Sequence, residues 1–166
     1  MRTVLMLAML AAIWVLPDPA LGATPGTPFR QGRVELIGTA GDGAVIRVTL
    51  ESSNPPGVPG GGQGWRWGAE GAAPQASLSL VEAYWGKDQV FIPRSAYVDL
   101  GNPRAASIET VGRRFRLVIS GGDAATSYTA MLLFEGGMIR NRKVVNSEFP
   151  DSAWEETVYS FTLKSE

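Results

Sequence analysis

Neither cysteine nor histidine occurs in the 166 residues of this chain. Without cysteine there is no disulfide, thiol nucleophile or thiolate metal site, so the fold must rely on an apolar core. Without histidine, a Ser-His-Asp triad, a Cys-His dyad and a histidine-ligated metal centre are all excluded. The three lysines, Lys87, Lys143 and Lys164, stand in no Ser-x-x-Lys setting, so the chain has no signature of a serine–lysine acylase.

The carboxylates form no recognisable catalytic pair. Glu155 and Glu156 are adjacent, and adjacent side chains diverge on a strand or a helix, so these two do not flank a glycosidic bond. A hydrolase whose carboxylates come from distant residues, such as Glu82 with Asp99, is the weaker alternative. We therefore predict a protein that is not an enzyme.

No calcium-loop run of the Asp-x-Asp-x-Asp-Gly type is present, so we predict no metal and no cofactor. Five loop aspartates, most of them next to glycine or proline, are typical of turns, and calcium held by them is the alternative: Asp42, Asp88, Asp99, Asp123 and Asp151.

The net charge of −1 is close to neutral, which argues against nucleic acid as a partner. Residues 1–23 have the layout of a secretory signal peptide: Arg2 near the start, an apolar run over 4–16, and the small residues Ala20, Gly22 and Ala23 around the expected cleavage site. The apolar run is shorter than the roughly 20 residues that a spanning helix needs. We expect export to the bacterial periplasm or the extracellular space, and no membrane span after signal cleavage.

The rest of the chain is predicted to be all-β, because short alternating segments are separated by glycine and proline turns. We expect a flexible lead-in over 24–32 and one β-sandwich domain over 33–166, with about nine mostly antiparallel strands. Its strands are expected near 33–40, 44–51, 75–85, 90–100, 106–111, 113–120, 126–135, 138–145 and 157–164. The spacing of Ser152 and Glu155 predicts one helical turn before the last strand.

The stretch 113–145 is a β-meander, with Gly136-Gly137 as a two-residue hairpin turn that pairs Glu135 with Met138. Continuing this register places Leu133 opposite Arg140 and Met131 opposite Arg142. With Phe115 opposite Leu132, one face carries the apolar residues Phe115, Leu117, Ile119, Tyr128, Ala130, Leu132 and Phe134.

The other face of the meander is then expected to carry four arginines: Arg114, Arg116, Arg140 and Arg142. Guanidinium groups at this density suit bidentate recognition of phosphate or carboxylate. The alternative is a solvated face, on which the arginines pair with glutamates such as Glu135 or Glu109.

The segment 52–74 is rich in glycine and proline and contains Trp65-Arg66-Trp67. Such a composition predicts a long loop, and long loops in compact domains are often functional. The two tryptophans are candidates for stacking on a sugar ring or a lipid surface, with Arg66 between them. The alternative is that one or both fold back over the end of a sheet.

These observations predict an exported, non-catalytic binding module for a glycan or an anionic group of the cell envelope or its surroundings. The candidate ligand residues are Trp65, Arg66, Trp67, Arg114, Arg116, Arg140 and Arg142. The alternative is a structural or protein-interaction domain that docks an envelope protein.

Overall fold

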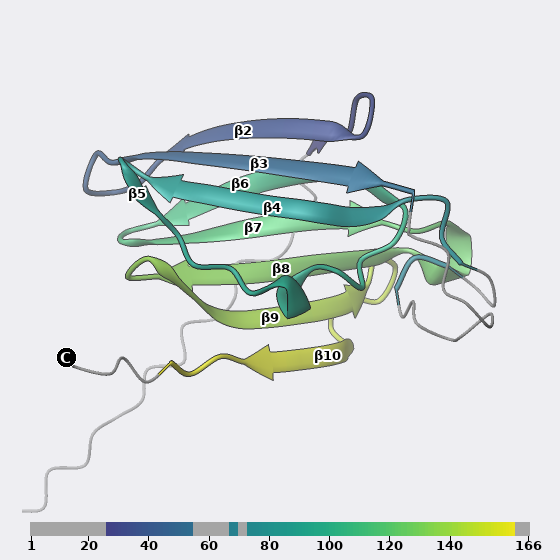
Figure 1. Cartoon of the computed structure of the whole chain (residues 1–166). Helices are drawn as coiled ribbons and strands as arrows, with labels where there is room; N and C mark the ends of the chain where they lie inside the picture. The colour runs from purple at the N-terminus through teal and green to yellow at the C-terminus, as the bar shows by residue number, and fades with distance from the viewer. Residues whose placement is uncertain (1–25, 55–66, 70–72, 162–166) are drawn as a thin grey trace, which may run out of the picture.

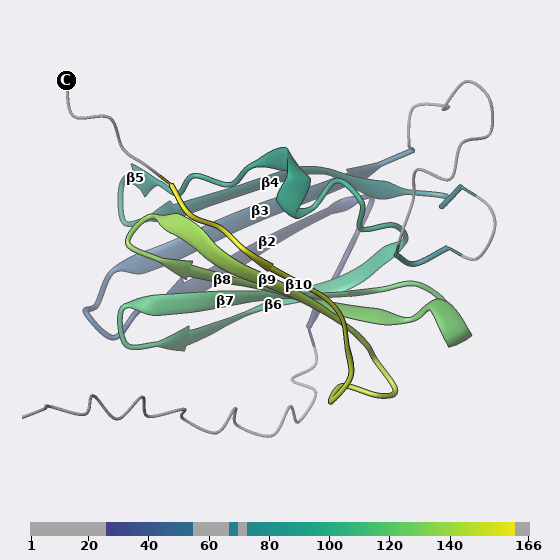
Figure 2. The same ribbon diagram turned by 90° about the horizontal axis from the view of Figure 1, so that it is seen from below.

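The computed structural model describes residues 26–54, 67–69 and 73–161. In this part of the chain two antiparallel sheets pack face to face as an all-β sandwich, as expected (Figures 1 and 2). There are ten strands in it rather than nine. The predicted signal peptide, residues 1–23, and most of the glycine-rich loop, residues 55–66 and 70–72, lie outside the described residues.

The larger sheet has six strands in the order β1-β6-β7-β8-β9-β10: β1 (Thr27–Pro28), β6 (Pro103–Val111), β7 (Arg114–Gly121), β8 (Tyr128–Glu135), β9 (Met138–Asn146) and β10 (Ala153–Val158). The smaller sheet has four strands in the order β2-β3-β4-β5: β2 (Arg33–Thr39), β3 (Val45–Ser53), β4 (Ser77–Trp85) and β5 (Asp88–Gln89).

The β8–β9 turn forms as the sequence predicts. Gly136 and Gly137 have φ angles of 60° and 77°, which a two-residue hairpin turn with two left-handed residues requires, and Glu135 pairs with Met138. Phe115 lies opposite Phe134 rather than Leu132, so the expected register of β7 and β8 was wrong by two residues. Because side chains alternate with a period of two, this slip leaves the predicted apolar face unchanged, and all seven of its residues are buried.

A β-bulge in β9 overturns the predicted register beyond the turn. Phe134 pairs with Ile139, but Leu133 pairs with Asn141, so Arg140 is an extra residue. Leu132 consequently lies opposite Arg142, and Met131 lies opposite Lys143. The expected pairs Leu133–Arg140 and Met131–Arg142 were wrong, and the one-residue shift turns Arg142 to the inner face of the sheet.

The six-stranded sheet is wider than the four-stranded sheet, and the connection from β5 to β6 covers part of the difference. This connection contains η1 (Arg94–Ala96), a single 3-10 turn, and continues the layer of the small sheet over β8 and β9 (Figures 1 and 2). Ala96, Tyr97 and Leu100 of the connection are buried in the core. The expectation of an extended strand over 90–100 was therefore wrong.

Two further expectations differ from the structure. The helical turn predicted from Ser152 and Glu155 is absent, because β10 already begins at Ala153 and pairs with β9. Within the predicted lead-in, Thr27 and Pro28 form β1, which pairs with Ala106 and Ala105 of β6. Capping-box spacing alone did not outweigh the cross-strand pairing available to an alternating segment.

Asn102 ties together the chain segments at one end of the sandwich. Its Nδ2 donates to the carbonyl of Gly68 at 2.7 Å, and its Oδ1 accepts from the backbone N–H of Gln75 and Ala76 at 2.9 and 3.3 Å. Its backbone carbonyl accepts from Gly122 N–H at 3.0 Å. Asn102 has a φ of 46°, a left-handed conformation that asparagine tolerates better than most residues.

We predict that Asn102→Ala lowers the free energy of unfolding by about 2–4 kcal/mol. The substitution removes three hydrogen bonds, and alanine has no polar side chain that could stabilise the left-handed backbone conformation as asparagine does. Asn102→Gly removes the same hydrogen bonds without the backbone strain, so it should be less destabilising by about 1 kcal/mol. Urea denaturation of the three proteins measures both differences. Equal stability of the wild type and Asn102→Ala would contradict the role of this side chain.

Candidate functional site

Trp67 is the one residue of the predicted Trp65-Arg66-Trp67 motif that the structure describes; Trp65 and Arg66 lie outside the described residues. Trp67 forms a parallel β-bridge with Leu100 and packs against the core cluster. Its ring stacks on Trp154, with 5.3 Å between the ring centroids and 7° between the planes. Trp67 thus folds back over the end of the sandwich, as the alternative interpretation expected for one or both tryptophans.

Trp154 is the outer ring of this indole stack, which we define as Trp67 and Trp154. The β9–β10 register passes from Ala153 opposite Val145 to Glu155 opposite Val144, so Trp154 is the extra residue of a β-bulge. Its side chain remains 39% exposed. The stack therefore presents a partly exposed indole, supported from behind by a ring that is fixed to the core.

The turn before β10 adds polar groups and a second exposed aromatic ring to this end of the sandwich. Asn146 Oδ1 accepts from the backbone N–H groups of Glu148 and Phe149 at 2.7 and 3.2 Å, which fixes the turn. Ser147 Oγ lies 3.1 Å from Thr129 Oγ1. Phe149 is 66% exposed.

Arg114 and Arg116 lie on the outer face of the six-stranded sheet, as predicted, but each is paired with a carboxylate. Arg114 Nε lies 3.1 Å from Glu135 Oε1, and Arg116 Nη1 lies 3.5 Å from Glu109 Oε2. These are the two glutamates named by the solvated-face interpretation. Arg140 is the half-exposed extra residue of the β9 bulge, beside the Gly136 turn.

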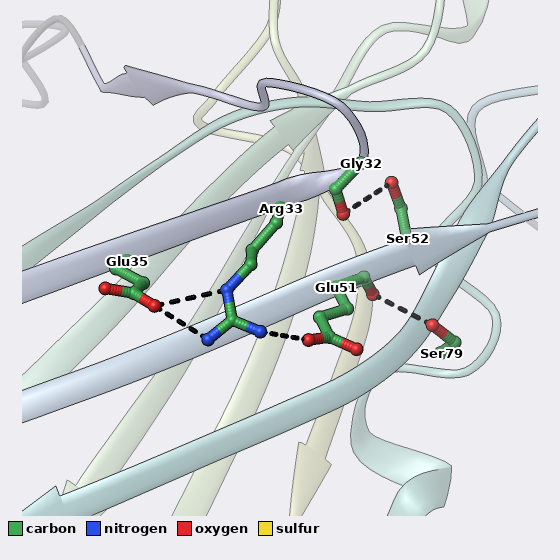
Figure 3. Close-up of polar contacts among 6 residues, drawn as sticks. All are labelled: Gly32, Arg33, Glu35, Glu51, Ser52 and Ser79. Atoms are coloured by element: carbon green, nitrogen blue, oxygen red, sulfur yellow. Dashed lines mark hydrogen bonds and ion pairs between the residues drawn. The ribbon is translucent and has the colours of Figure 1, made fainter.

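The outer face of the four-stranded sheet shows the same pattern. Figure 3 shows Arg33 between two glutamates, with Nη2 at 2.7 Å from Glu35 Oε1 and Nη1 bonded to Glu51. The carboxylate of Glu35, by hydrogen bond and charge, raises the pKa of Arg33. Arg33, Arg114 and Arg116 thus each have a carboxylate beside the guanidinium that balances its charge.

Arg142 lies on the inner face, where its side chain is only 2% exposed. Nη2 donates to Asp99 Oδ2 at 2.7 Å, and Nη1 donates to the carbonyl of Ser95 at 3.1 Å. Nε lies 3.6 Å from Glu155 Oε1, which also accepts from Thr157 Oγ1 at 2.9 Å. Arg142 was therefore wrongly placed with the outer arginines; it joins β9, the β5–β6 connection and the edge strand β10 from inside.

Charge and burial compete within this cluster. Burial by itself would lower the pKa of Arg142, but the hydrogen bond and charge of Asp99, together with Glu155, raise it above its ordinary value. Burial, reinforced by Asp99, raises the pKa of the Tyr128 phenol far above its ordinary range. Burial also raises the pKa of Tyr159. The Tyr128 hydroxyl has no hydrogen-bond partner in the described part of the chain.

Trp154, Asp99 and Glu155 are the residues that sequence reasoning missed. Trp154 stands between Ala153 and Glu155, and nothing in the local pattern links it to Trp67. Asp99 was considered only as a turn residue or as a distant partner of Glu82. Counting an extra residue in β9 would have brought Arg142 inward, and a buried arginine requires a carboxylate partner.

The described residues contain no group of three or more acidic, histidine or cysteine side chains suited to a metal ion. None of their helices has the length and hydrophobicity needed to cross a membrane. Comparison of the chain with protein-family models, with curated proteins and with solved structures finds no match.

We predict that Arg142→Gln and Arg116→Gln differ sharply in stability, although the substitution is identical. Arg142→Gln removes a buried guanidinium and leaves the half-buried carboxylates of Asp99 and Glu155 without their counter-ion, so it should lower the free energy of unfolding by about 3–5 kcal/mol. Arg116→Gln breaks a half-buried pair on the outer face whose atoms lie 3.5 Å apart, and should cost about 1 kcal/mol. Chemical denaturation gives both values.

A double-mutant cycle separates the charge effect from loss of packing. When Asp99→Asn is added to Arg142→Gln, the double variant should be more stable than the sum of the two single losses predicts. Additive losses, or equal losses for the two arginine variants, would contradict the buried ion pair.

We predict that Tyr128 makes the protein less stable at alkaline pH. In the unfolded chain its phenol ionises near the ordinary value of 10.0, whereas the folded chain keeps it protonated to higher pH. The folded state then binds more protons, so the free energy of unfolding falls as pH rises above 10, by up to about 1.4 kcal/mol per pH unit.

Tyr128→Phe tests this linkage. The variant should be at least as stable as the wild type at pH 7, because the removed hydroxyl lacks a partner in the described chain, and its stability should fall less steeply above pH 10. Urea denaturation at several pH values measures both effects. Parallel curves for the two proteins would refute the prediction.

Proposed function

We propose that this protein is an exported, non-catalytic binding module that recognises a neutral glycan by stacking a sugar ring on Trp154. The observation that carries the proposal is the indole stack: a partly exposed tryptophan supported by Trp67, which is itself fixed to Leu100 and the core. A flat aromatic ring held in one orientation binds with little loss of side-chain entropy.

The neighbouring groups suit a polar ligand. The turn that precedes Trp154 carries Ser147, Glu148, Asp151 and Ser152, whose side chains offer hydroxyl and carboxylate partners for sugar hydroxyl groups. Phe149 adds a second exposed ring to the same turn. The paired arginines favour a neutral glycan over the anionic ligand that the sequence also suggested.

Export is part of the proposal and rests on residues 1–23, which have the composition of a secretory signal. The non-catalytic part rests on the absence of histidine and cysteine and on the carboxylates Asp99 and Glu155, which are engaged by Arg142.

The alternative is a protein-interaction domain that uses the edge strand β10. Val158 on this strand is 77% exposed, and an edge strand offers backbone groups to an added strand. Against this, the β-bulge at Trp154 and the charged Glu155 and Glu156 are features that protect sheet edges from pairing.

We predict that a neutral oligosaccharide from a glycan library raises the melting temperature and changes tryptophan fluorescence, because a ligand that binds only the folded protein stabilises it. Trp154→Ala should weaken binding at least tenfold, since loss of an aromatic anchor costs about 2 kcal/mol or more. Isothermal titration of the wild type and variants with the best oligosaccharide gives the affinities.

Val158→Ala is the matched control, because it changes another exposed residue of β10 without touching the stack. Trp67→Phe keeps a ring behind Trp154 and should retain most of the affinity. No binding to any neutral glycan, or equal affinity of Trp154→Ala and the wild type, would refute the glycan proposal. Loss of a protein partner in Val158→Ala pull-downs would instead favour the edge-strand alternative.

A further inference from the structure

A pocket of about 290 Å³ opens beside the edge of the four-stranded sheet, and it shares no residue with the indole stack. We call it the β4–β5 pocket; it is lined by Val81, Glu82, Gln89, Val90, Phe91 and Ile92. Its volume is near the lower end of the range of about 300–1,000 Å³ that is usual for ligand pockets. It therefore suits a small group rather than a nucleotide or an oligosaccharide.

The pocket exists because two chain segments diverge. β5 pairs with β4 only at Tyr84 and Trp85, and Val90 N–H still donates to the Ala83 carbonyl at 2.9 Å. The next residue turns to the other sheet, where Phe91 N–H donates to the Gly137 carbonyl at 3.0 Å. The edge of β4 beside Val81 and Glu82 is thus left open.

The walls of the pocket are fixed before any ligand binds. Val81 and Val90 are buried in the core cluster. Phe91 makes an edge-to-face contact with Phe161, with ring centroids 5.4 Å apart and planes at 89°, yet its side chain is 54% exposed. A large aromatic ring held in place but left half in solvent offers a surface for a ligand.

Glu82 is the one charged residue of the lining, and it is half-buried. No ion pair or hydrogen bond of its side chain occurs within the described residues. Arg47 stands diagonally across from it on β3, but Arg47 Nη2 donates to the carbonyl of Gly86 at 2.7 Å. The pocket therefore combines a carboxylate that has no counter-ion among residues 26–54, 67–69 and 73–161, an aromatic ring, the amide of Gln89 and apolar walls.

We propose that the β4–β5 pocket binds a primary alkylammonium group. Glu82 supplies the counter-ion, Phe91 supplies a cation–π contact, and the half-buried Ile92 contacts the carbon chain. The same chemistry is found in a free aliphatic amine and in a lysine side chain of a polypeptide. This site is separate from the indole stack and does not depend on glycan binding.

The test is an NMR titration of the ¹⁵N-labelled protein with n-pentylammonium chloride, with n-pentanol as the neutral control. Saturable shifts are expected in the Gln89 side-chain amide and in the backbone amides of Val90, Phe91 and Ile92. Pentanol should bind at least tenfold more weakly. Equal binding of pentanol, or shifts confined to other parts of the protein, would overturn the proposal.

Two substitutions assign the roles within the pocket. Glu82→Gln keeps the shape of the side chain and should weaken pentylammonium binding about tenfold, because one charge-assisted hydrogen bond is lost. Phe91→Leu should weaken it about threefold to tenfold through loss of the cation–π contact. Glu148→Gln, a carboxylate on the distant β9–β10 turn, is the matched control and should leave the affinity unchanged.

The melting temperature of each variant checks that it folds. A folded Glu82→Gln variant that binds pentylammonium as tightly as the wild type would refute the assignment of the counter-ion. Titration with cadaverine and with N-acetyl-lysine-methylamide then distinguishes the two sources. Tighter binding of cadaverine supports a free amine as the ligand, and tighter binding of the lysine derivative supports a polypeptide.

Discussion

The single extra residue at Arg140 determines how the β5–β6 connection is joined to the six-stranded sheet. Without the bulge, Arg142 would lie opposite Met131 on the outer face; with it, Arg142 lies opposite Leu132 among core side chains. A buried guanidinium is tolerable only when its charge is paired and its N–H groups have acceptors. Asp99 and Glu155 balance the charge, and Asp99 and the Ser95 carbonyl accept from the two terminal nitrogens, whereas Nε makes no hydrogen bond to a described residue. Ser95 and Asp99 come from the β5–β6 connection, which pairs with neither β9 nor β10 as a strand.

The same ion-pair cluster holds the β5–β6 connection over the part of the six-stranded sheet that the narrower sheet does not cover. A six-stranded sheet over a four-stranded one leaves the inner face around β9 and β10 without an opposing strand. The β5–β6 connection lies over this region, and Arg142 binds it through Ser95 and Asp99. On the other side Glu155 connects Arg142 to β10. A hydrophobic contact could also hold the connection and β10 against β9. Hydrogen bonds to a planar guanidinium, in addition, fix the orientation of the connection relative to β9.

Much of the architecture could be predicted from the sequence, because alternation and glycine turns are local signals. The apolar face of the meander was correct even where the β7–β8 register was two residues off, since a shift by two preserves the face. The bulge could not be predicted in this way: an extra residue leaves the alternation of β9 nearly intact on each side. The 3-10 turn of η1 and the early start of β10 depend on tertiary contacts with Arg142 and with β9, which no local pattern records.

The candidate sites show the same difference between what a local sequence pattern predicts and what depends on tertiary contacts. The arginines predicted to share one face were identified by spacing alone, and spacing does not show whether each charge has a partner. In the structure Arg114 is paired with Glu135 and Arg116 with Glu109, so a neighbouring carboxylate balances each positive charge. The residues on which we base the two binding proposals both lie where strand pairing is interrupted: Trp154 in the bulge of β10, and Glu82 where β5 leaves β4. In a sheet protein, regular pairing uses the backbone groups and packs the side chains, so binding surfaces arise where that regularity ends.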